Sequence, residues 1–162
     1  MKDYYIGEAV HIGNNSVIHP MCTIGTIPFF YRDEVDEFKM VDIGNDVVIH
    51  SGTNINYGVL GKTVIGNRVK IDSHCHIAHD CKIGEGTLIA AGFVSGGFVE
   101  IGKNCRIGLN VTIKNRVKVA DGTFIGMGAV ITHDVSGRII ADRKNIDKKL
   151  LEKIDTLRGE FQ

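Results

Sequence analysis

The fold is decided by residues 65–131, which read in sixes as IGNRVK IDSHCH IAHDCK IGEGTL IAAGFV SGGFVE IGKNCR IGLNVT IKNRVK VADGTF IGMGAV I. An aliphatic residue begins every hexad except the one that begins at Ser95. Such a period fits neither an α-helix, which repeats every ~3.6 residues, nor a simple strand, which repeats every ~2. It is typical of a hexapeptide-repeat parallel β-helix, in which short strands stack along one axis.

A second track of small or medium apolar residues lies four positions after each aliphatic residue, as Val69 follows Ile65. The other positions are mostly polar. We therefore expect the first and fifth residues of each hexad to face the core and the others to face out or form corners. Glycine often follows the aliphatic residue, as in Ile83-Gly84, and we expect it there to relieve tight corners that often have positive φ.

These repeats resemble those of the left-handed parallel β-helix, in which three hexads make one triangular coil. The resemblance implies a left-handed path, an exception to the usual right-handed crossover. The ladder extends back to Ile6 with two interruptions. The step from Ile24 to Ile43 exceeds one hexad by a long insertion, and the step from Ile55 to Ile65 exceeds it by a short one. The longer insertion, residues 30–42, is predicted to be a projecting loop, and loops of that length are more often functional than not.

Residues 1–141 are thus predicted to form one all-β solenoid domain, and residues 142–162 to form a C-terminal α-helix. One apolar stripe at helical spacing runs along that segment, formed by Ile146, Leu150, Ile154, Leu157 and Phe161. We expect this helix to cap the solenoid and to pack on another subunit.

The composition favours a cytoplasmic protein. The 162 residues carry no formal net charge, so the overall balance does not point to nucleic acid or to an anionic membrane. The hexads begin near Tyr5, which leaves no room for a signal peptide, and no apolar run reaches transmembrane length. All four cysteines occupy fifth positions, where a free Cys acts as a small hydrophobe rather than a nucleophile or disulfide partner: Cys22, Cys75, Cys81 and Cys105.

The residues with chemical potential gather in residues 71–81, IDSHCHIAHDC. His76, His79 and Asp80 fall at outward positions of their hexads. Residues one coil apart should stack at roughly 4.8 Å, the inter-strand spacing. Counting three hexads per coil, and allowing for the short insertion, one edge of the prism is expected to carry a column of four residues with Asp80 beside it: Tyr57, His79, Gly97 and Asn115.

That edge is suited to a transfer reaction. An outward His next to a carboxylate is a candidate general base, because its pKa is ordinarily near 6.5 and the carboxylate can fix its tautomer. Gly97, one coil away, presents a backbone N–H to a developing oxyanion. No outward Ser or Cys partners His79, so we expect direct transfer without a covalent enzyme intermediate.

The segment HIAHDC, residues 76–81, resembles the active-site segment of the UDP-N-acetylglucosamine O-acyltransferases of lipid A synthesis. The wider stretch TVIGNRVKIDSHCHIAHDCKIG, residues 63–84, also resembles the UDP-3-O-acylglucosamine N-acyltransferases. Residues 101–110, IGKNCRIGLN, are similar to the bacterial amino-sugar N-acetyltransferases. The resemblance covers most of residues 5–136.

The resemblance implies that His79 is the general base, that Asp80 orients it, and that the Gly97 amide binds the acyl carbonyl. It also implies a homotrimer with active sites between subunits. The donor's phosphates are expected at outward residues of the C-terminal coils, and the acceptor at residues beside His79: Lys114, Asn115, Arg116 and Lys118 for the donor, and Asn56, Tyr57 and His76 for the acceptor.

We therefore hypothesise an acetyltransferase that moves an acyl group from acetyl-CoA to the amine of a nucleotide-linked sugar in bacterial surface glycan synthesis. Acetyl-CoA is a co-substrate here, and no bound cofactor or metal is expected. An alternative is a sugar O- or N-acyltransferase of the lipid A type that uses acyl carrier protein. The lipid A O-acyltransferases have a His where this chain has Phe98. Acceptor recognition is therefore expected to come from the loop at residues 30–42, the short loop near Tyr57 and a neighbouring subunit.

Two other classes remain open. A γ-type carbonic anhydrase holds Zn²⁺ with three histidines across a subunit interface, and His74 and His79 lie close enough in sequence to suit part of that pattern. The segments typical of that family are absent from this chain. A non-catalytic solenoid that serves as a binding module is the second class.

Overall fold

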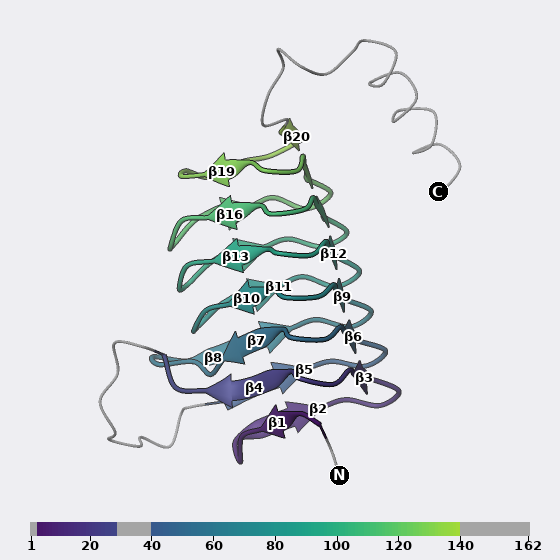
Figure 1. The fold of residues 1–162 in the computed structure, drawn as a ribbon. Coiled ribbons are helices and arrows are strands. Elements are labelled where there is room, and N and C mark those ends of the chain that lie inside the picture. The colour runs from purple at the N-terminus through teal and green to yellow at the C-terminus, as the bar shows by residue number, and fades with distance from the viewer. Residues whose placement is uncertain (1–2, 29–39, 140–162) are drawn as a thin grey trace.

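A computed structural model describes residues 3–28 and 40–139, which form a three-sided parallel β-helix (Figure 1). The chain visits three sheets in turn, and each strand pairs in parallel with the strand one coil away. The coils stack from the N-terminal end to β20 in one column. The solenoid predicted from the period of six is confirmed.

The described strands are short, and each sheet takes every third one, except that β20 follows β18 in the last sheet. The first sheet, sheet A, has seven strands: β1 (Tyr5–Ile6), β4 (Thr23–Thr26), β7 (Asn54–Asn56), β10 (His76–Ile77), β13 (Val94–Ser95), β16 (Thr112–Ile113) and β19 (Val130–Ile131). Sheet B has six: β2 (Val10–Ile12), β5 (Met40–Ile43), β8 (Lys62–Ile65), β11 (Lys82–Ile83), β14 (Glu100–Ile101) and β17 (Lys118–Val119). Sheet C has seven: β3 (Val17–Ile18), β6 (Val48–Ile49), β9 (Lys70–Ile71), β12 (Leu88–Ile89), β15 (Arg106–Ile107), β18 (Phe124–Ile125) and β20 (Arg138–Ile139).

The pairing register confirms both insertions. His76 pairs with Val94, which lies three hexads further along the chain. Asn54 pairs with His76, and the separation between these two exceeds three hexads by the length of the short insertion. Thr23 pairs with Asn54 across a still longer separation, as the long insertion requires. That insertion ends earlier than expected, because Met40–Ile43 is strand β5 and pairs with β2 and β8. The rest of the loop, residues 29–39, and the predicted C-terminal helix lie outside the described residues.

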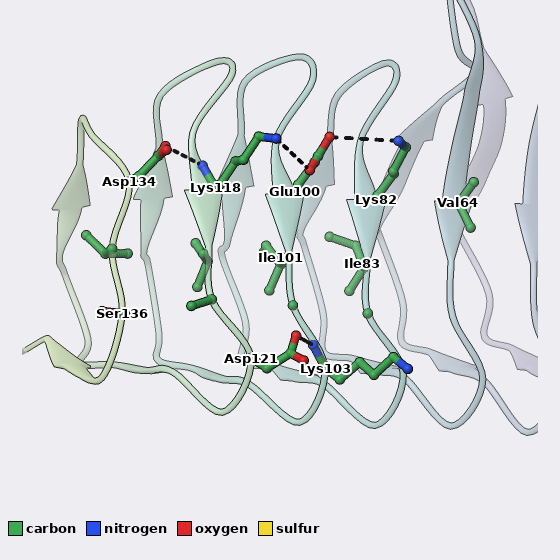
Figure 2. A pocket seen from close by; sticks show the side chains of 15 residues that line it. Val64, Lys82, Ile83, Glu100, Ile101, Lys103, Lys118, Asp121, Asp134 and Ser136 are labelled. Carbon is green, nitrogen blue, oxygen red and sulfur yellow. Dashed lines mark hydrogen bonds and ion pairs between the residues drawn. The ribbon is translucent and has the colours of Figure 1, made fainter.

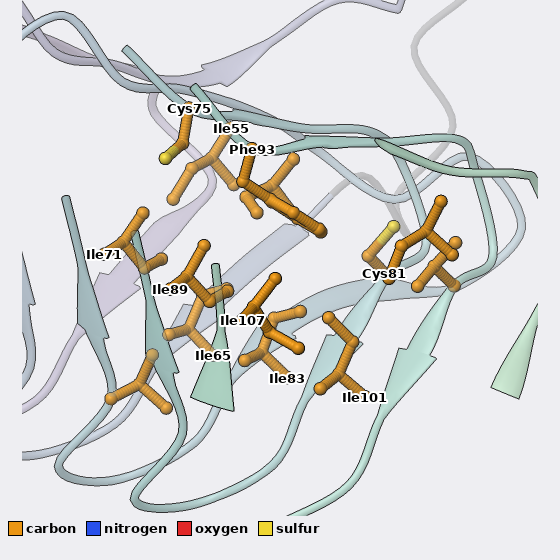
Figure 3. Close-up of a cluster of buried hydrophobic side chains, with 14 of the residues drawn as sticks. Ile55, Ile65, Ile71, Cys75, Cys81, Ile83, Ile89, Phe93, Ile101 and Ile107 are labelled. Atoms are coloured by element: carbon orange, nitrogen blue, oxygen red, sulfur yellow. The ribbon is translucent and has the colours of Figure 1, made fainter. Parts of the chain in front are cut away.

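The core is a stack of isoleucines from the first hexad position, filled in by residues from the fifth (Figure 3). The four cysteines are free and buried in this core, as predicted. Burial raises the thiol pKa of each, because a low-dielectric interior disfavours the thiolate: Cys22, Cys75, Cys81 and Cys105. Neutral buried thiols are poor nucleophiles, which agrees with their packing role.

The corner glycines act differently from the expectation. Gly84 and the other glycines that follow an aliphatic residue of the regular ladder at residues 65–131 do not have positive φ. A Cβ on Gly84 would lie 2.4 Å from the backbone of Gly102, so the close approach of adjacent coils excludes a side chain. The left-handed corner is the fourth position of the hexad, where Asp80 has φ 57° and Phe98 has φ 61°.

Within the described part of the chain, no helix has the length and apolar character needed to cross a lipid bilayer.

Ile71 tests the stacked core. Its side chain is fully buried between Ile49 and Ile89 in sheet C. Ile71→Ala should lower the free energy of unfolding by about 2–5 kcal/mol, because it removes buried methyl groups and leaves a cavity. The exposed neighbour gives the control: Lys70→Ala should change it by no more than about 0.5 kcal/mol. Denaturant unfolding measures both free energies. Equally small losses in the two variants would contradict the burial of Ile71 in the core.

Candidate active site

His79 lies in the turn between β10 and β11, at the edge where sheet A meets sheet B. The predicted stacking of His79 on Gly97 is confirmed, because a Cβ on Gly97 would lie 2.5 Å from Nε2 and Cε1 of His79. The imidazole therefore lies directly against the Gly97 backbone, and only glycine leaves room for it. The His79 side chain remains 25% exposed, so the ring can still meet a ligand.

Asp80 is buried, contrary to the expectation that it faces out. Its residue exposure is 7%, because the short insertion after Tyr57 folds over it. Oδ2 accepts the N–H of Val59 at 2.8 Å, and Oδ1 accepts the N–H of Leu60 at 3.0 Å. Oδ2 also lies 2.9 Å from Nδ1 of His79. One carboxylate thus holds both the loop and the histidine.

This arrangement fixes the histidine's tautomer. An ionised carboxylate can only accept hydrogen bonds, so Nδ1 of His79 must carry the proton that Asp80 accepts. In the neutral ring, Nε2 is then the nitrogen with a free lone pair, and this is the atom beside Gly97. A proton acceptor is therefore aimed along the outer edge of the coil.

Gly97 offers a donor next to that acceptor. Its carbonyl accepts the N–H of Arg116 at 2.9 Å. Within residues 3–28 and 40–139, its own N–H donates no hydrogen bond. An oxyanion donor needs an amide that is not already bonded, so the role predicted for Gly97 stays a prediction that this geometry allows.

An aromatic and cationic stack flanks the imidazole. The Phe98 ring meets His79 edge to face, with ring centroids 5.1 Å apart and planes at 88°. The guanidinium carbon of Arg116 lies 4.5 Å from the centre of the Phe98 ring on the next coil. The predicted donor-site residue Arg116 thus lies beside the site, with Phe98 between it and His79.

The predicted acceptor residues gather at the same end of sheet A. His76 faces out from β10, pairs with Asn54, and is half-buried. Desolvation by this burial lowers the pKa of the His76 imidazole. Asn56 is buried, and its amide donates to Thr26 Oγ1 at 3.0 Å. Tyr57 is half-buried and packs against the hydrophobic core, so it is not a freely exposed surface aromatic.

The remaining residues predicted to bind the donor divide between two faces. Lys114 and Asn115 are exposed one coil beyond Gly97, on the site's edge. Lys118 lies instead on sheet B, where its Nζ is 3.3 Å from Glu100, which also pairs with Lys82 at 3.8 Å (Figure 2). This ladder lines a shallow groove of about 710 Å³ that does not include His79. A smaller groove over sheet C also leaves out His79.

The histidines do not assemble a metal site within the described residues. No group of three His, Cys, Asp or Glu side chains there is placed to hold a metal ion. His74 lies in the turn between β9 and β10, and its ring packs against Gly52, whereas His79 lies in the following turn. The two side chains therefore lie at different corners of the coil, although they are close in sequence.

The fold and site define a parallel β-helix with an aligned His–Asp pair at one edge. Residues 62–92 and 98–133 match the family described as bacterial transferase hexapeptide (six repeats). The chain is 30% identical over 137 residues to a UDP-3-O-acylglucosamine N-acyltransferase from Bordetella pertussis, covering 78% of this chain and 38% of that protein. It is 35% identical over 129 residues to an acyl-[acyl-carrier-protein]–UDP-N-acetylglucosamine O-acyltransferase from Helicobacter pylori, covering 76% and 47%.

A UDP-N-acetylglucosamine acyltransferase from Campylobacter jejuni shares the fold, with a TM-score of 0.67 and 22% identity over 98% of this chain and 81% of that one. The chain carries the repeats of the bacterial transferase hexapeptide family and resembles hexapeptide-repeat acyltransferases, and its solenoid is a left-handed parallel β-helix. It spans less than half the length of the two curated relatives.

Asp80 provides a test of the loop contact. In Asp80→Ala, the amides of Val59 and Leu60 should exchange with solvent about ten- to a hundredfold faster, since a hydrogen bond to a charged group contributes about 1.5–3 kcal/mol. Asp121→Ala is the control, because Asp121 likewise accepts an N–H from another coil, that of Lys103 at 2.7 Å. Hydrogen exchange by NMR that is unchanged at both loop amides in Asp80→Ala would contradict this account.

Proposed function

We propose that this chain transfers an acyl group from acyl carrier protein to a UDP-linked glucosamine derivative, with His79 as general base. The observation that carries the proposal is the aligned imidazole: Nδ1 is held by buried Asp80, and Nε2 lies against Gly97. The relatives' names support a nucleotide-sugar acceptor, and one of them specifies acyl carrier protein as the donor. This support favours the lipid A-type alternative over acetyl-CoA.

The chemistry follows from the positions of two groups. Nε2 of His79 removes a proton as the acceptor's nitrogen or oxygen attacks the thioester carbonyl. The carbonyl oxygen gains negative charge and meets the N–H of Gly97, which has no acceptor among the described residues. As the carbon–sulfur bond breaks, the imidazolium returns its proton to the leaving thiolate, so the amide or ester and a free thiol are the products. Asp80 stabilises the transient imidazolium.

The proposal includes a second subunit that covers the exposed side of the site. His79 lies on an edge of a triangular prism, and an edge is convex. The two grooves described over the sheet faces do not reach it. A neighbouring copy in a homotrimer would close the site and exclude water from the thioester. Arg116 and Lys114 would then meet the single phosphate of the donor's phosphopantetheine arm at the C-terminal side of His79.

The proposal is tested by measuring thiol release with acyl-carrier-protein thioesters against UDP-N-acetylglucosamine and UDP-3-O-acylglucosamine, beside acetyl-CoA as a second donor. His79→Ala should lower kcat about 10²–10⁴-fold, the usual contribution of a general base. His133→Ala is the matched control, because that histidine is exposed and bonds only to its neighbour Thr132 among the described residues.

Light scattering on each variant would confirm that the assembly is unchanged. Equal rates in His79→Ala and wild type would refute the role of His79. Turnover with acetyl-CoA but not with acyl carrier protein would refute the proposed donor.

A further inference from the structure

The single lapse in the aliphatic ladder falls one coil away from the proposed catalytic base. Ser95 ends β13, and the register of β10 with β13 places it beside Ile77, two residues before His79. Its residue is 2% exposed. In the coils on either side, the same inward slot holds Ile77 and Ile113. A polar side chain in an isoleucine slot needs a partner, because burying an unsatisfied hydroxyl is costly.

The partner of Ser95 is the backbone that leads into His79. In neighbouring coils, the residue after each ladder residue donates its N–H to the ladder carbonyl one coil on. Gly66 bonds in this way to Ile83 at 2.8 Å. Ala78 differs, because its N–H donates to Oγ of Ser95 at 3.0 Å. The β10–β13 pairing accordingly contains only the pair His76–Val94, so the ladder lacks the Ile77–Ser95 rung two residues before His79.

The Ser95 side chain also contacts the far end of the same segment. Its Oγ lies 3.5 Å from Sγ of Cys81, and that thiol donates to the carbonyl of Gly96 at 3.2 Å. One hydroxyl therefore touches both ends of the segment 78–81. The two middle residues of that segment are His79 and Asp80.

We propose that Ser95 is a positioning residue, which sets the place of the His79 imidazole over Gly97 through the N–H of Ala78. The inference rests on the proposed role of His79. A hydroxyl inside the coil takes the place of the carbonyl that orders this peptide in a regular coil. Removing it frees the peptide next to the base, and displacements of about 1 Å in an active site can cost about a hundredfold in rate.

The test is the kinetics of Ser95→Ala in the full chain. Its kcat should fall about ten- to a hundredfold with little change in KM, as expected when a supporting contact of a catalytic group is lost. Ser95→Thr keeps the hydroxyl and should restore most of kcat. Ser95→Cys matches serine in shape but accepts hydrogen bonds weakly, so it should lose activity too. It serves as the replacement if the alanine variant does not fold.

Thr87→Val is the matched control for a merely structural role. Thr87 is also buried, at 0% exposure, and its Oγ1 accepts the N–H of Cys105 at 3.0 Å, away from His79. This variant should lose thermal stability as Ser95→Ala does, yet keep kcat. Equal kcat in the folded Ser95→Ala and Thr87→Val variants would overturn the proposal.

A second readout separates this inference from the proposed function. In protein labelled with ¹⁵N-histidine, the Nδ1–H resonance of His79 should shift or broaden in Ser95→Ala and stay unchanged in Thr87→Val. If no donor and acceptor pair supports turnover in wild type, the proposed function fails. The His79 resonance alone then decides whether Ser95 positions the imidazole. A His79 signal that is identical in wild type and Ser95→Ala would then overturn the positioning role.

Discussion

The structure depends on the parallel backbone ladder that joins each coil to the next. Each short strand pairs in parallel with a strand one coil away, so residues three hexads apart, such as His76 and Val94, are forced into one column. Strands this short have little stability alone, and only the stacking of many coils buries the isoleucine core. The same ladder brings His79 against Gly97, although three hexads separate them along the chain.

The proposed chemistry is located where the regular ladder is interrupted. The short insertion adds residues above Asp80, and their amides turn an outward carboxylate into a buried one that accepts two backbone hydrogen bonds as well as the His79 proton. A carboxylate held by three donors is rigid, so the histidine beside it keeps one tautomer. Ser95 interrupts the ladder on the other side of the same segment. Regular coils provide the scaffold, and two local exceptions hold the proposed base.

The sequence predicts much of this because the period of six assigns every residue to a column. The positions of Tyr57, His79 and Gly97 follow from counting, and both insertions appear as changes in that count. The burial of Asp80 does not follow, because counting places the insertion beside it without giving the path of its backbone. The reason for the corner glycines is also missed, since close contact between Gly84 and Gly102 depends on coil spacing rather than on local φ. The gap at Ser95 is visible in the sequence, but its hydrogen bond to Ala78 depends on the three-dimensional positions of the two residues.

The proposed mechanism requires that Nε2 of His79 accept the proton of the attacking group while the Gly97 amide binds the acyl oxygen. The most direct measurement is a crystal structure with a UDP-linked glucosamine acceptor and an acyl-carrier donor whose thioester is replaced by an inert analogue. The accepting nitrogen or oxygen should lie roughly 2.6–3.2 Å from Nε2 of His79. The acyl oxygen should lie roughly 2.7–3.1 Å from the Gly97 nitrogen. An acceptor bound against a different side chain, with Nε2 of His79 left facing solvent, would contradict the account.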